Sequence, residues 1–272
     1  MTEHRVAVVT GAGTGIGQAM AVKFASLGWS VAIGGRRVEK LQETAQLVRD
    51  AGGTPFAGAL DVSSPASVDE FFAGAEAALG PVSVAINNAA VARYGDMDDF
   101  SPEEIAAEVN TKLLGSLYVA RRAIQTMRQQ DEGVADIVFV TSLAAVLPWV
   151  HHLPYAASNA GAEHAARILK QELEGTGIRV STFRCGETIG TDFATKEMES
   201  GRVFTSSELW FRRGLLRHTG AMTPDMVADA VAHMVTLPAG CQFELVQMVP
   251  TAPRGPVPET MEELAALFEQ LQ

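Results

Sequence analysis

The stretch Thr10-Gly11-Ala12-Gly13-Thr14-Gly15-Ile16-Gly17 decides how this chain folds. Residues 5–10 form a short apolar, β-branched run that predicts a strand, and residues 15–27 have the pattern of a helix. Glycines between a strand and a helix allow a tight turn, and the N–H groups and dipole at the start of the helix attract phosphate oxygens. We therefore predict a dinucleotide site, because a turn without a ligand is the weaker alternative in a strand–turn–helix unit. Its predicted contacts are Gly11, Thr14, Gly15, Ile16 and Gly17.

Strand-like and helix-like patterns alternate along nearly the whole chain. Further strands are predicted at residues 30–33, 55–60, 82–86, 135–140, 178–183 and 242–249. Further helices are predicted at residues 39–51, 65–79, 103–130, 155–173, 224–236 and 259–271, while residues 192–222 have an irregular pattern. Short apolar strands that alternate with helices indicate an α/β fold, in which a parallel sheet is covered on both faces. No shift in composition marks a linker, so residues 1–272 are predicted to form a single domain.

Composition and charge narrow the classes of partner. The 272 residues carry a formal net charge of −11, which argues against nucleic acid or an anionic membrane surface. The two cysteines, Cys185 and Cys241, stand in unrelated contexts, so we predict neither a disulfide framework nor a metal site. The first residues lead directly into a strand, and no apolar run approaches the roughly 18 residues of a membrane span. We therefore expect a cytoplasmic protein that acts on a small molecule.

The end of the second strand predicts which dinucleotide binds. A site that prefers NAD commonly has an acidic side chain there, which bonds the ribose 2′-hydroxyl. This chain has Gly35 at that place, followed by Arg36 and Arg37, and guanidinium groups suit a 2′-phosphate. We therefore expect NADP, with Arg36 as the stronger candidate, and two solvated charges at the start of a helix are the alternative. Asp61-Val62 after the third strand is a candidate contact for the adenine ring, although Asp61 could instead cap the next helix.

A second group of polar residues lies between Ser142 and Asn159. Ser142 follows a strand-like run, and Pro154 suits the first turn of a helix, where its missing N–H needs no partner. Tyr155 and Asn159 are four positions apart and therefore share one face of that helix. A strand-end hydroxyl and a helix-borne phenol form a candidate proton-handling pair. An ordinary loop with a buried tyrosine that bonds a carbonyl is the alternative.

Together these motifs resemble the short-chain dehydrogenase/reductase family over essentially the whole chain. The matching residues are the glycine turn, Asp61-Val62, Asn87-Asn88-Ala89-Ala90, Asn110, Ser142 and Tyr155. The resemblance implies a Rossmann-type, doubly wound sheet of about seven strands, in a homotetramer or homodimer packed through helices 103–130 and 155–173. It also implies that Tyr155 is the general acid/base, that Ser142 orients the substrate oxygen, and that Asn110 holds a helix distortion and a water. The cofactor contacts that it adds are Asn88, Ala89, Gly186 and Thr188.

Asn159 is the largest departure from the family, whose motif Tyr-x-x-x-Lys has lysine at this position. In the family that lysine bonds the nicotinamide ribose and lowers the pKa of the tyrosine. Asn159 can still bond the ribose, so we assign it both a catalytic and a cofactor-binding place. It carries no charge, and a cation about 6 Å away at an effective dielectric near 20 shifts a pKa by roughly two units. Neither Lys112 nor Lys170 is placed by the sequence to replace the missing amine.

Aromatic residues predict the substrate side of the site. Residues 190–222 correspond to the segment that covers the substrate in the family, and an apolar lid is expected there. A packed helix with solvated arginines is the alternative. We expect His151 and His152 to line the preceding loop or to face the solvent. The predicted substrate contacts are Ser142, Trp149, His152, Tyr155 and Trp210, and Phe193, Met198, Phe204 and Phe211 would add to the lid.

The sequence thus predicts an NADP-dependent oxidoreductase that reduces a carbonyl of a small, largely apolar substrate. Tyr155 would donate the proton and the nicotinamide would donate the hydride. Reduction needs a protonated phenol and oxidation needs a phenolate, so loss of the lysine should slow alcohol oxidation more than carbonyl reduction. Two alternatives stay open. The chain could be a non-redox acid/base enzyme, such as an isomerase, dehydratase or cyclase, or it could be a regulatory subunit.

Overall fold

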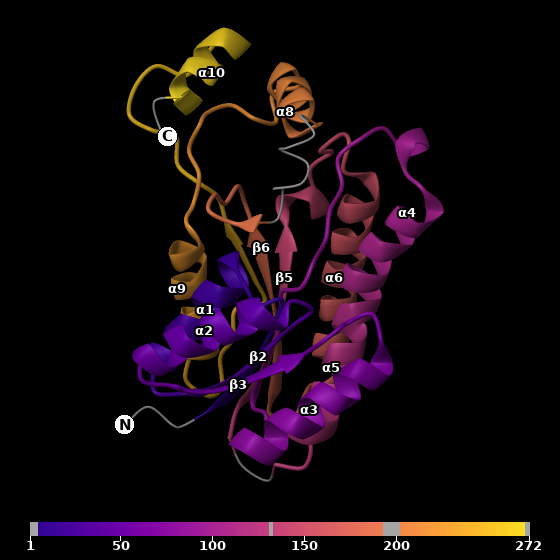
Figure 1. Ribbon diagram of the computed structural model, residues 1–272, viewed down its shortest axis with the longest axis vertical. Helices are drawn as coiled ribbons and strands as arrows, with labels where there is room; N and C mark the ends of the chain where they lie inside the picture. Colours follow the sequence, from indigo (N-terminus) through magenta and orange to yellow (C-terminus); the bar gives the residue numbers. More distant parts are fainter. Residues whose placement is uncertain (1–4, 131–132, 193–201, 270–272) are drawn as a thin grey trace.

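The computed structural model describes residues 5–130, 133–192 and 202–269, and these residues build a seven-stranded sheet flanked by helices (Figure 1). Every pair of neighbouring strands is parallel, and the spatial order is β3-β2-β1-β4-β5-β6-β7. This arrangement confirms the predicted doubly wound α/β sheet. The order reverses between β1 and β4, where ligands of such sheets bind beyond the carboxyl ends of the strands. The strands are β1 (Val6–Thr10), β2 (Ser30–Gly35), β3 (Thr54–Ala59), β4 (Val84–Asn87), β5 (Ala135–Ser142), β6 (Ile178–Cys185) and β7 (Leu245–Met248).

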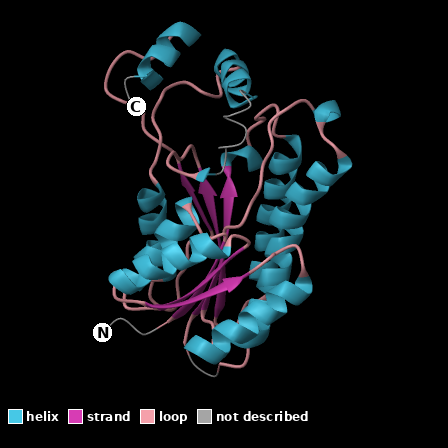
Figure 2. Ribbon diagram, viewed as in Figure 1, coloured by secondary structure: helices cyan, strands magenta, loops and turns pink. Residues whose placement is uncertain are grey.

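Helices cover both faces of the sheet, as Figures 1 and 2 show. One face carries α1 (Gly15–Ser26), α2 (Val38–Asp50) and α9 (Pro224–Val235), and the other carries α3 (Pro65–Leu79), α5 (Gly115–Met127) and α6 (Leu153–Glu172). Side chains alternate along a strand, so Ala7 and Val9 of β1 enter the core of the first face, whereas Val6 and Val8 enter the core of the second. The central strands are therefore apolar on both sides, which explains their continuous apolar runs in the sequence.

Local signals in the sequence set where several helices begin. Ser101 starts α4 (Pro102–Val109) with a capping box, in which its hydroxyl accepts from the backbone N–H of Glu104 and the Glu104 carboxylate accepts from the N–H of Ser101. Ser64 and Thr223 cap α3 and α9 in the same position, each followed by a proline in the first turn. The shorter or peripheral helical segments are η1 (Met97–Asp99), η3 (Leu143–Ala145), α8 (Arg202–Arg212) and α10 (Met261–Glu269).

Residues 103–130, predicted as one helix, are interrupted in the structure. α4 ends at Val109, a π-helical segment η2 (Asn110–Leu114) follows, and α5 begins at Gly115. The N–H of Gly115 donates to the carbonyl of Asn110, five positions earlier, which is the π-helical spacing. A Cβ on Gly115 would lie 2.7 Å from Cγ2 of Val62, so the helix passes very close to the connection after β3. The helical pattern continues on both sides of η2, so the local pattern gave no sign of the interruption, whereas the helix distortion that the family resemblance implied at Asn110 is present.

For part of residues 192–222 the irregular pattern was wrong and the alternative, a packed helix, is present. Residues 202–212 form α8, and Trp210 on this helix is buried. Its partners are Tyr94 and Trp149, which lie far from it along the chain. A helix that packs through such distant contacts does not need the strong local apolar pattern from which we predict helices.

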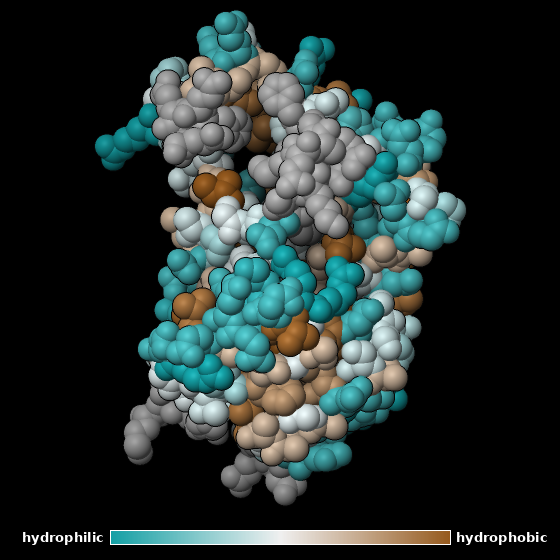
Figure 3. All heavy atoms as spheres, in the orientation of Figure 1, coloured by the Kyte–Doolittle hydropathy of each residue, from teal (hydrophilic) through white to brown (hydrophobic). Residues whose placement is uncertain are grey.

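The polarity of the outer surface differs between the elements that form it. In Figure 3, hydrophilic residues cover α1 and α2, while paler and brown residues lie over β3 and α3. Among the helices of the described residues, none has the length and the apolar composition of a membrane span.

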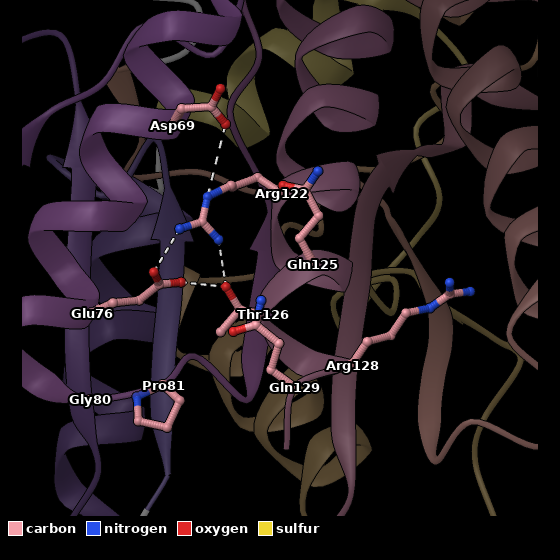
Figure 4. Close-up of a pocket in the computed structure, with 9 residues that line it drawn as sticks. All are labelled: Asp69, Glu76, Gly80, Pro81, Arg122, Gln125, Thr126, Arg128 and Gln129. Carbon is pink, nitrogen blue, oxygen red and sulfur yellow. Dashed lines mark hydrogen bonds and ion pairs between the residues drawn. The ribbon is translucent and has the colours of Figure 1, made fainter. Parts of the chain in front are cut away.

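A surface hollow between α3 and α5 is lined by Asp69, Glu76, Arg122 and Thr126, which pair mainly with one another (Figure 4). It also includes Gly80 and Pro81, just before β4, and so lies at the amino edge of the sheet, opposite the glycine turn.

A buried ion cluster holds the amino ends of the strands together. Asp136 at the start of β5 accepts hydrogen bonds from Nε and Nη2 of Arg179 on β6, at 2.8 and 2.9 Å. Nη2 of Arg5, just before β1, lies 2.8 Å from the same carboxylate. The two guanidinium groups also donate to backbone carbonyls, including that of Val235 at the end of α9. Asp136 therefore balances two buried cations and joins three strands.

Asp136→Asn should lower the free energy of unfolding by about 3–5 kcal/mol, because both buried guanidinium groups would lose their counter-charge. Urea denaturation followed by circular dichroism measures the effect. The control is Glu244→Gln, which breaks the exposed pair with Lys170 and should leave the free energy of unfolding nearly unchanged, because solvent screens that pair. Equal losses in the two variants would contradict the role assigned to the cluster.

Candidate active site

Three glycines give the turn between β1 and α1 its shape. Gly11 and Gly15 have φ values of 66° and 58°, in the left-handed region that side chains disfavour. A Cβ on Gly17 would lie 2.4 Å from the carbonyl oxygen of Gly11 and 2.7 Å from Nδ2 of Asn88. α1 begins at Gly15, so its first N–H groups point into the turn. The glycines predicted from the sequence therefore lie together in one tight turn at the start of α1.

Asn88 and Ala89 join this turn to the end of β4. Nδ2 of Asn88 donates to the carbonyl of Thr10 at 2.9 Å, and the backbone N–H groups of Asn88 and Ala89 donate to Oγ1 of Thr10 at 3.0 Å each. The Thr10 hydroxyl in turn donates to the carbonyl of Ile86. These bonds fix the distance between β1 and β4 at the point where the strand order reverses. The crevice between the two strand ends is thus rigid before any ligand binds.

Two exposed arginines follow β2, as predicted. Arg37 donates to Oγ1 of Thr14 at 3.0 Å and pairs with Asp192 at 3.0 Å, so it bridges the glycine turn and the segment after β6. The side chain of Asp61 accepts from Ser63, and these bonds, with a smaller contribution from the charge of Arg36, hold the pKa of Asp61 below its usual value. Ser64 is the residue that caps α3, so the alternative assignment of Asp61 as the cap is wrong. The next residue, Val62, is buried.

Ser142 and Tyr155 meet at the carboxyl edge of the sheet. Ser142 is the last residue of β5, and its hydroxyl accepts from the N–H of Ala144 at 3.2 Å. Tyr155 lies in the first turn of α6, which begins at Leu153 and has a proline in its first turn. The side chain of Ser142 hydrogen-bonds to the phenol of Tyr155. The predicted hydroxyl–phenol pair is therefore present.

Burial controls the titration of the phenol. Desolvation raises the pKa of Tyr155 to about 12, and the hydrogen bonds from Ser142 and Asn159 offset only part of that effect. Cys185 and Glu108 face the phenol and add to the rise when they are charged. Tyr155 is therefore protonated throughout the neutral pH range.

Asn159 is fully buried one helical turn after Tyr155. Its Nδ2 atom donates to the backbone carbonyl of Tyr155 at 2.9 Å. Its Oδ1 atom is buried without a hydrogen-bond donor among the described residues. An acceptor buried in this way usually has a partner, such as water or a bound group. Asn159 thus presents one unused acceptor beside the phenol.

The interrupted helix places Asn110 and Lys112 on the same side of the sheet. Asn110 is half-buried and is the first residue of η2. Lys112 is 2% exposed, and its amine donates to the carbonyl of Val140 and, at 3.4 Å, to that of Asn87. The sequence gave Lys112 no place in the site, but the structure puts its amine at the carboxyl ends of β4 and β5. The spacing to Asn110 could not reveal this, because η2 changes the direction of the side chains.

Gly186 and Thr188 follow β6 and lie beside Cys185. The hydroxyl of Thr188 donates to the carbonyl of Gly186 at 3.2 Å and lies 3.3 Å from Sγ of Cys185. The backbone of Thr188 pairs with that of Met222, which ties the start of the 187–191 segment to the residues before α9. This segment therefore has a defined path next to the glycine turn, where Thr191 contacts Gly15.

An aromatic cluster borders the phenol. The ring of His152 stacks on Trp210 with centroids 5.4 Å apart and an interplanar angle of 13°, and it lies 4.1 Å from Tyr94 and 5.3 Å from Tyr155. Trp149 packs edge-on against Trp210, whose indole N–H donates to the carbonyl of Val150. Of the two positions expected for His152, lining the loop or facing the solvent, the second is excluded, because the rings of Tyr94 and Trp210 bury it.

The sequence did not identify Tyr94, which lies in an irregular segment without a motif. His151, by contrast, has a φ of 66° and contacts Ser206 on α8 at 2.9 Å, so it helps to hold that helix over the loop. Two of the predicted lid residues, Phe193 and Met198, lie outside the described residues, as does the side chain of Phe204. The lid is therefore defined here by Trp210 and its neighbours.

The architecture and the Ser142–Tyr155 pair define a dinucleotide-binding enzyme fold with an acid–base site. Residues 5–201 match the family model described as short chain dehydrogenase, which is more than half of the chain. The chain therefore belongs to the short-chain dehydrogenase family of oxidoreductases.

Relatives of this chain carry several activities. It is 34% identical over 234 residues to 3beta-hydroxysteroid dehydrogenase 1 of Eggerthella lenta, a match that covers 85% of this chain and 87% of that protein. It is 28% identical over 251 residues to NADP-dependent 3-hydroxy acid dehydrogenase YdfG of Salmonella typhi, covering 90% and 94% of the two chains. Among solved structures, an actinorhodin polyketide ketoreductase variant with NADPH superimposes with a TM-score of 0.80 at 26% identity, covering 92% of this chain and 97% of that one.

Gly17→Ala should lower the free energy of unfolding by about 1–3 kcal/mol, because the new methyl group would overlap the Gly11 carbonyl and the Asn88 amide. The midpoint of urea denaturation measures this loss. Gly161→Ala is the matched control, since its methyl group would meet only the Leu113 side chain at 3.3 Å. The control should leave stability unchanged or raise it by up to about 1 kcal/mol, because alanine is favoured over glycine inside a helix. Unchanged stability in Gly17→Ala would mean that the turn is not as closely packed as described.

Proposed function

We propose that this protein is an NADP-dependent reductase that converts a carbonyl of a small, largely apolar substrate to an alcohol. The observation that carries the proposal is the hydrogen-bonded pair of Ser142 and Tyr155 beside a glycine turn shaped for a dinucleotide. Relatives described as an NADP-dependent 3-hydroxy acid dehydrogenase and a ketoreductase with NADPH support this reaction class and this cofactor. The names of these relatives point to different substrates, so the proposal names a substrate class and no single compound.

The residues present fit NADP. The glycine turn and the start of α1 would hold the pyrophosphate. The absence of a Cβ at Gly17 lets α1 approach the Gly11 carbonyl closely and gives the turn this shape. Arg36 and Arg37 would bind the 2′-phosphate, and Asn88 and Ala89 would lie beside the adenosine side of the crevice. The unused Oδ1 of Asn159 would accept a hydrogen bond from a ribose hydroxyl. The bound nicotinamide supplies the hydride.

The chain's own groups would handle the oxygen and the proton. Ser142 would donate a hydrogen bond to the substrate carbonyl and hold it next to Tyr155. Tyr155 would give its proton to the oxygen as negative charge develops there, since burial keeps the phenol protonated at neutral pH. Asn110, at the start of η2, would support a water that returns a proton to the phenol.

The aromatic cluster suits an apolar substrate. Trp149, Trp210 and the ring of His152 would cover the side of the carbonyl away from the cofactor. Closing such a site removes water from the reacting groups, which strengthens their electrostatic interactions. For the assembly, we propose a homodimer or homotetramer packed through α5 and α6, which carry the exposed apolar side chains of Leu117 and Ile168.

The protein should bind NADPH at least ten times more tightly than NADH, because a charge-assisted hydrogen bond to the 2′-phosphate contributes about 1.5–3 kcal/mol. A titration followed by nicotinamide fluorescence gives both dissociation constants. Arg36→Ser should remove most of the difference by weakening NADPH alone. Arg128→Ser, an exposed arginine at the hollow between α3 and α5, should change neither constant. Equal affinities of the unaltered protein for both cofactors would count against NADP.

Carbonyl reduction should be nearly independent of pH between about 6 and 9, whereas alcohol oxidation should rise with pH from neutral values. Reduction uses the phenol, which stays protonated because the pKa of Tyr155 is raised to about 12, and oxidation uses the scarce phenolate. Steady-state rates in both directions across this range test the expectation. Tyr155→Phe should lower both rates by about 10²–10⁴-fold. Equal rates at pH 7, or a fully active Tyr155→Phe variant, would contradict this assignment.

A further inference from the structure

His151 is the one residue, among those described and apart from glycines, whose backbone lies in the left-handed region, with a φ of 66°. A side chain is strained there, and strained residues persist only where the surrounding structure holds them, often at functional sites. Here the backbone N–H of Gly95, in the connection after β4, donates to the carbonyl of His151 at 3.1 Å. The turn at His151 is thus held by a distant segment of the chain.

The ring of His151 joins two further segments. Its Nδ1 atom lies 2.9 Å from Oγ of Ser206 on α8, and its Nε2 atom lies 3.4 Å from Oδ1 of Asp96. The tautomer with its proton on Nε2 suits both contacts, because it donates to the carboxylate and accepts from the hydroxyl. Ser206 is 1% exposed, whereas the side chain of Asp96 is 73% exposed. The contact with Ser206 is therefore the shielded one, and solvent weakens the contact with Asp96.

The helix α8 meets the same loop at a second point, one turn further on. Trp210 comes four positions after Ser206, so the two side chains share one face of α8. The indole N–H of Trp210 donates to the carbonyl of Val150 at 2.8 Å. Two consecutive loop residues, Val150 and His151, thus hold two consecutive turns of α8, which lies beyond the carboxyl ends of β5 and β6 (Figure 1).

The docked helix covers the acid–base site. The ring of His152 stacks on Trp210 with centroids 5.4 Å apart and lies 5.3 Å from the ring of Tyr155. Tyr155 itself packs against the cluster that contains Trp210. The adjacent histidines therefore take separate places, since the ring of His151 contacts Ser206 while that of His152 stacks inside the cluster. The left-handed turn at His151 accommodates this division.

We infer that His151 is a positioning residue of the substrate site. Its ring docks α8 through Ser206, and the docked helix holds Trp210 as an apolar cover next to Tyr155. The inference rests on the proposed function of Tyr155 in carbonyl reduction. His151 acts through α8 and not on the reacting atoms, so it should govern how well the substrate is held and not how fast the proton moves.

Removal of the ring should loosen α8 and weaken substrate binding. One hydrogen bond changes an equilibrium by about 3- to 10-fold, so the undocked form of α8 should become more populated by that factor in His151→Ala. A substrate that binds only when α8 is docked meets an apparent affinity lowered by up to the same factor. We therefore expect KM for an apolar carbonyl substrate to rise by about 2- to 10-fold, with kcat changed by less than about twofold.

The first test uses the protein without cofactor or substrate. Hydrogen exchange followed by mass spectrometry should show the amides of α8 exchanging about 3- to 10-fold faster in His151→Ala, with those of α1 unchanged. Ser206→Ala removes the same contact from the other side and should give the same result, so it serves if the first variant does not fold. The matched control is His164→Ala, which alters an exposed histidine of α6 and should leave exchange in α8 unchanged. Unchanged exchange in α8 of a folded variant would overturn the inference.

A conservative variant tests which atom of the ring is used. In His151→Asn the amide oxygen takes a place close to that of Nδ1 and can accept from Ser206, and asparagine tolerates the left-handed backbone. The shorter side chain gives up the contact with Asp96. Exchange in α8 and KM should therefore return close to the values of the unaltered protein. If His151→Asn behaves like His151→Ala, the contact with Ser206 is not what docks the helix.

A pair of variants separates the ring from the backbone strain. His151→Gly and His151→Ala both lack the ring, but only glycine is relaxed at a φ of 66°. His151→Gly should therefore unfold at a higher urea concentration than His151→Ala, while both show the same rise in KM. A KM that returns to normal in His151→Gly would assign the effect to the strained backbone and contradict the role of the ring.

The kinetic test compares substrate and cofactor. The dissociation constant of NADPH should be the same in His151→Ala and the unaltered protein, because the glycine turn is held by other contacts. Weaker NADPH binding, an unchanged KM, or a fall in kcat as large as the rise in KM would show a structural role only. If exchange in α8 responds as expected but no carbonyl compound is reduced and NADPH does not bind, the proposed function fails while the docking of α8 by His151 stands.

Discussion

The packing of Gly17 against the Gly11 carbonyl and the Asn88 amide is the contact on which the site depends. It brings the start of α1 against the ends of β1 and β4, and the hydroxyl of Thr10 locks these strand ends to Asn88 and Ala89. The crevice for a dinucleotide is thereby fixed at the point where the strand order reverses. Ser142 and Tyr155 lie at the same edge because β5 is parallel to its neighbours and α6 begins just beyond it.

Desolvation is the second constraint, and it acts on two groups in opposite directions. It raises the pKa of the Tyr155 phenol and lowers the pKa of the Lys112 amine, because burial disfavours the charged form of each. The phenol is therefore protonated at neutral pH, while the amine remains mostly charged.

Much of the fold could be predicted because it follows from local patterns. Strands buried on both faces must be apolar throughout, and helices that cover them need one apolar side, so the alternation of elements indicated the parallel sheet. The glycine turn was equally predictable, since φ values near 60° and a missing Cβ restrict the positions of Gly11, Gly15 and Gly17 to glycine. Ser142 and Tyr155 could be placed because one ends a strand and the other begins a helix.

The sequence by itself thus determined the sheet, the glycine turn and the hydroxyl–phenol pair, all of which depend on neighbours along the chain. Only the tertiary structure decided that Lys112 reaches the strand ends, that His152 lies between Tyr94 and Trp210, and that Asp136 balances two arginines. The physical reason is the same in each case. One extra residue in a helical turn, or a contact between segments far apart in the chain, changes where a side chain points without changing the local pattern of polar and apolar residues.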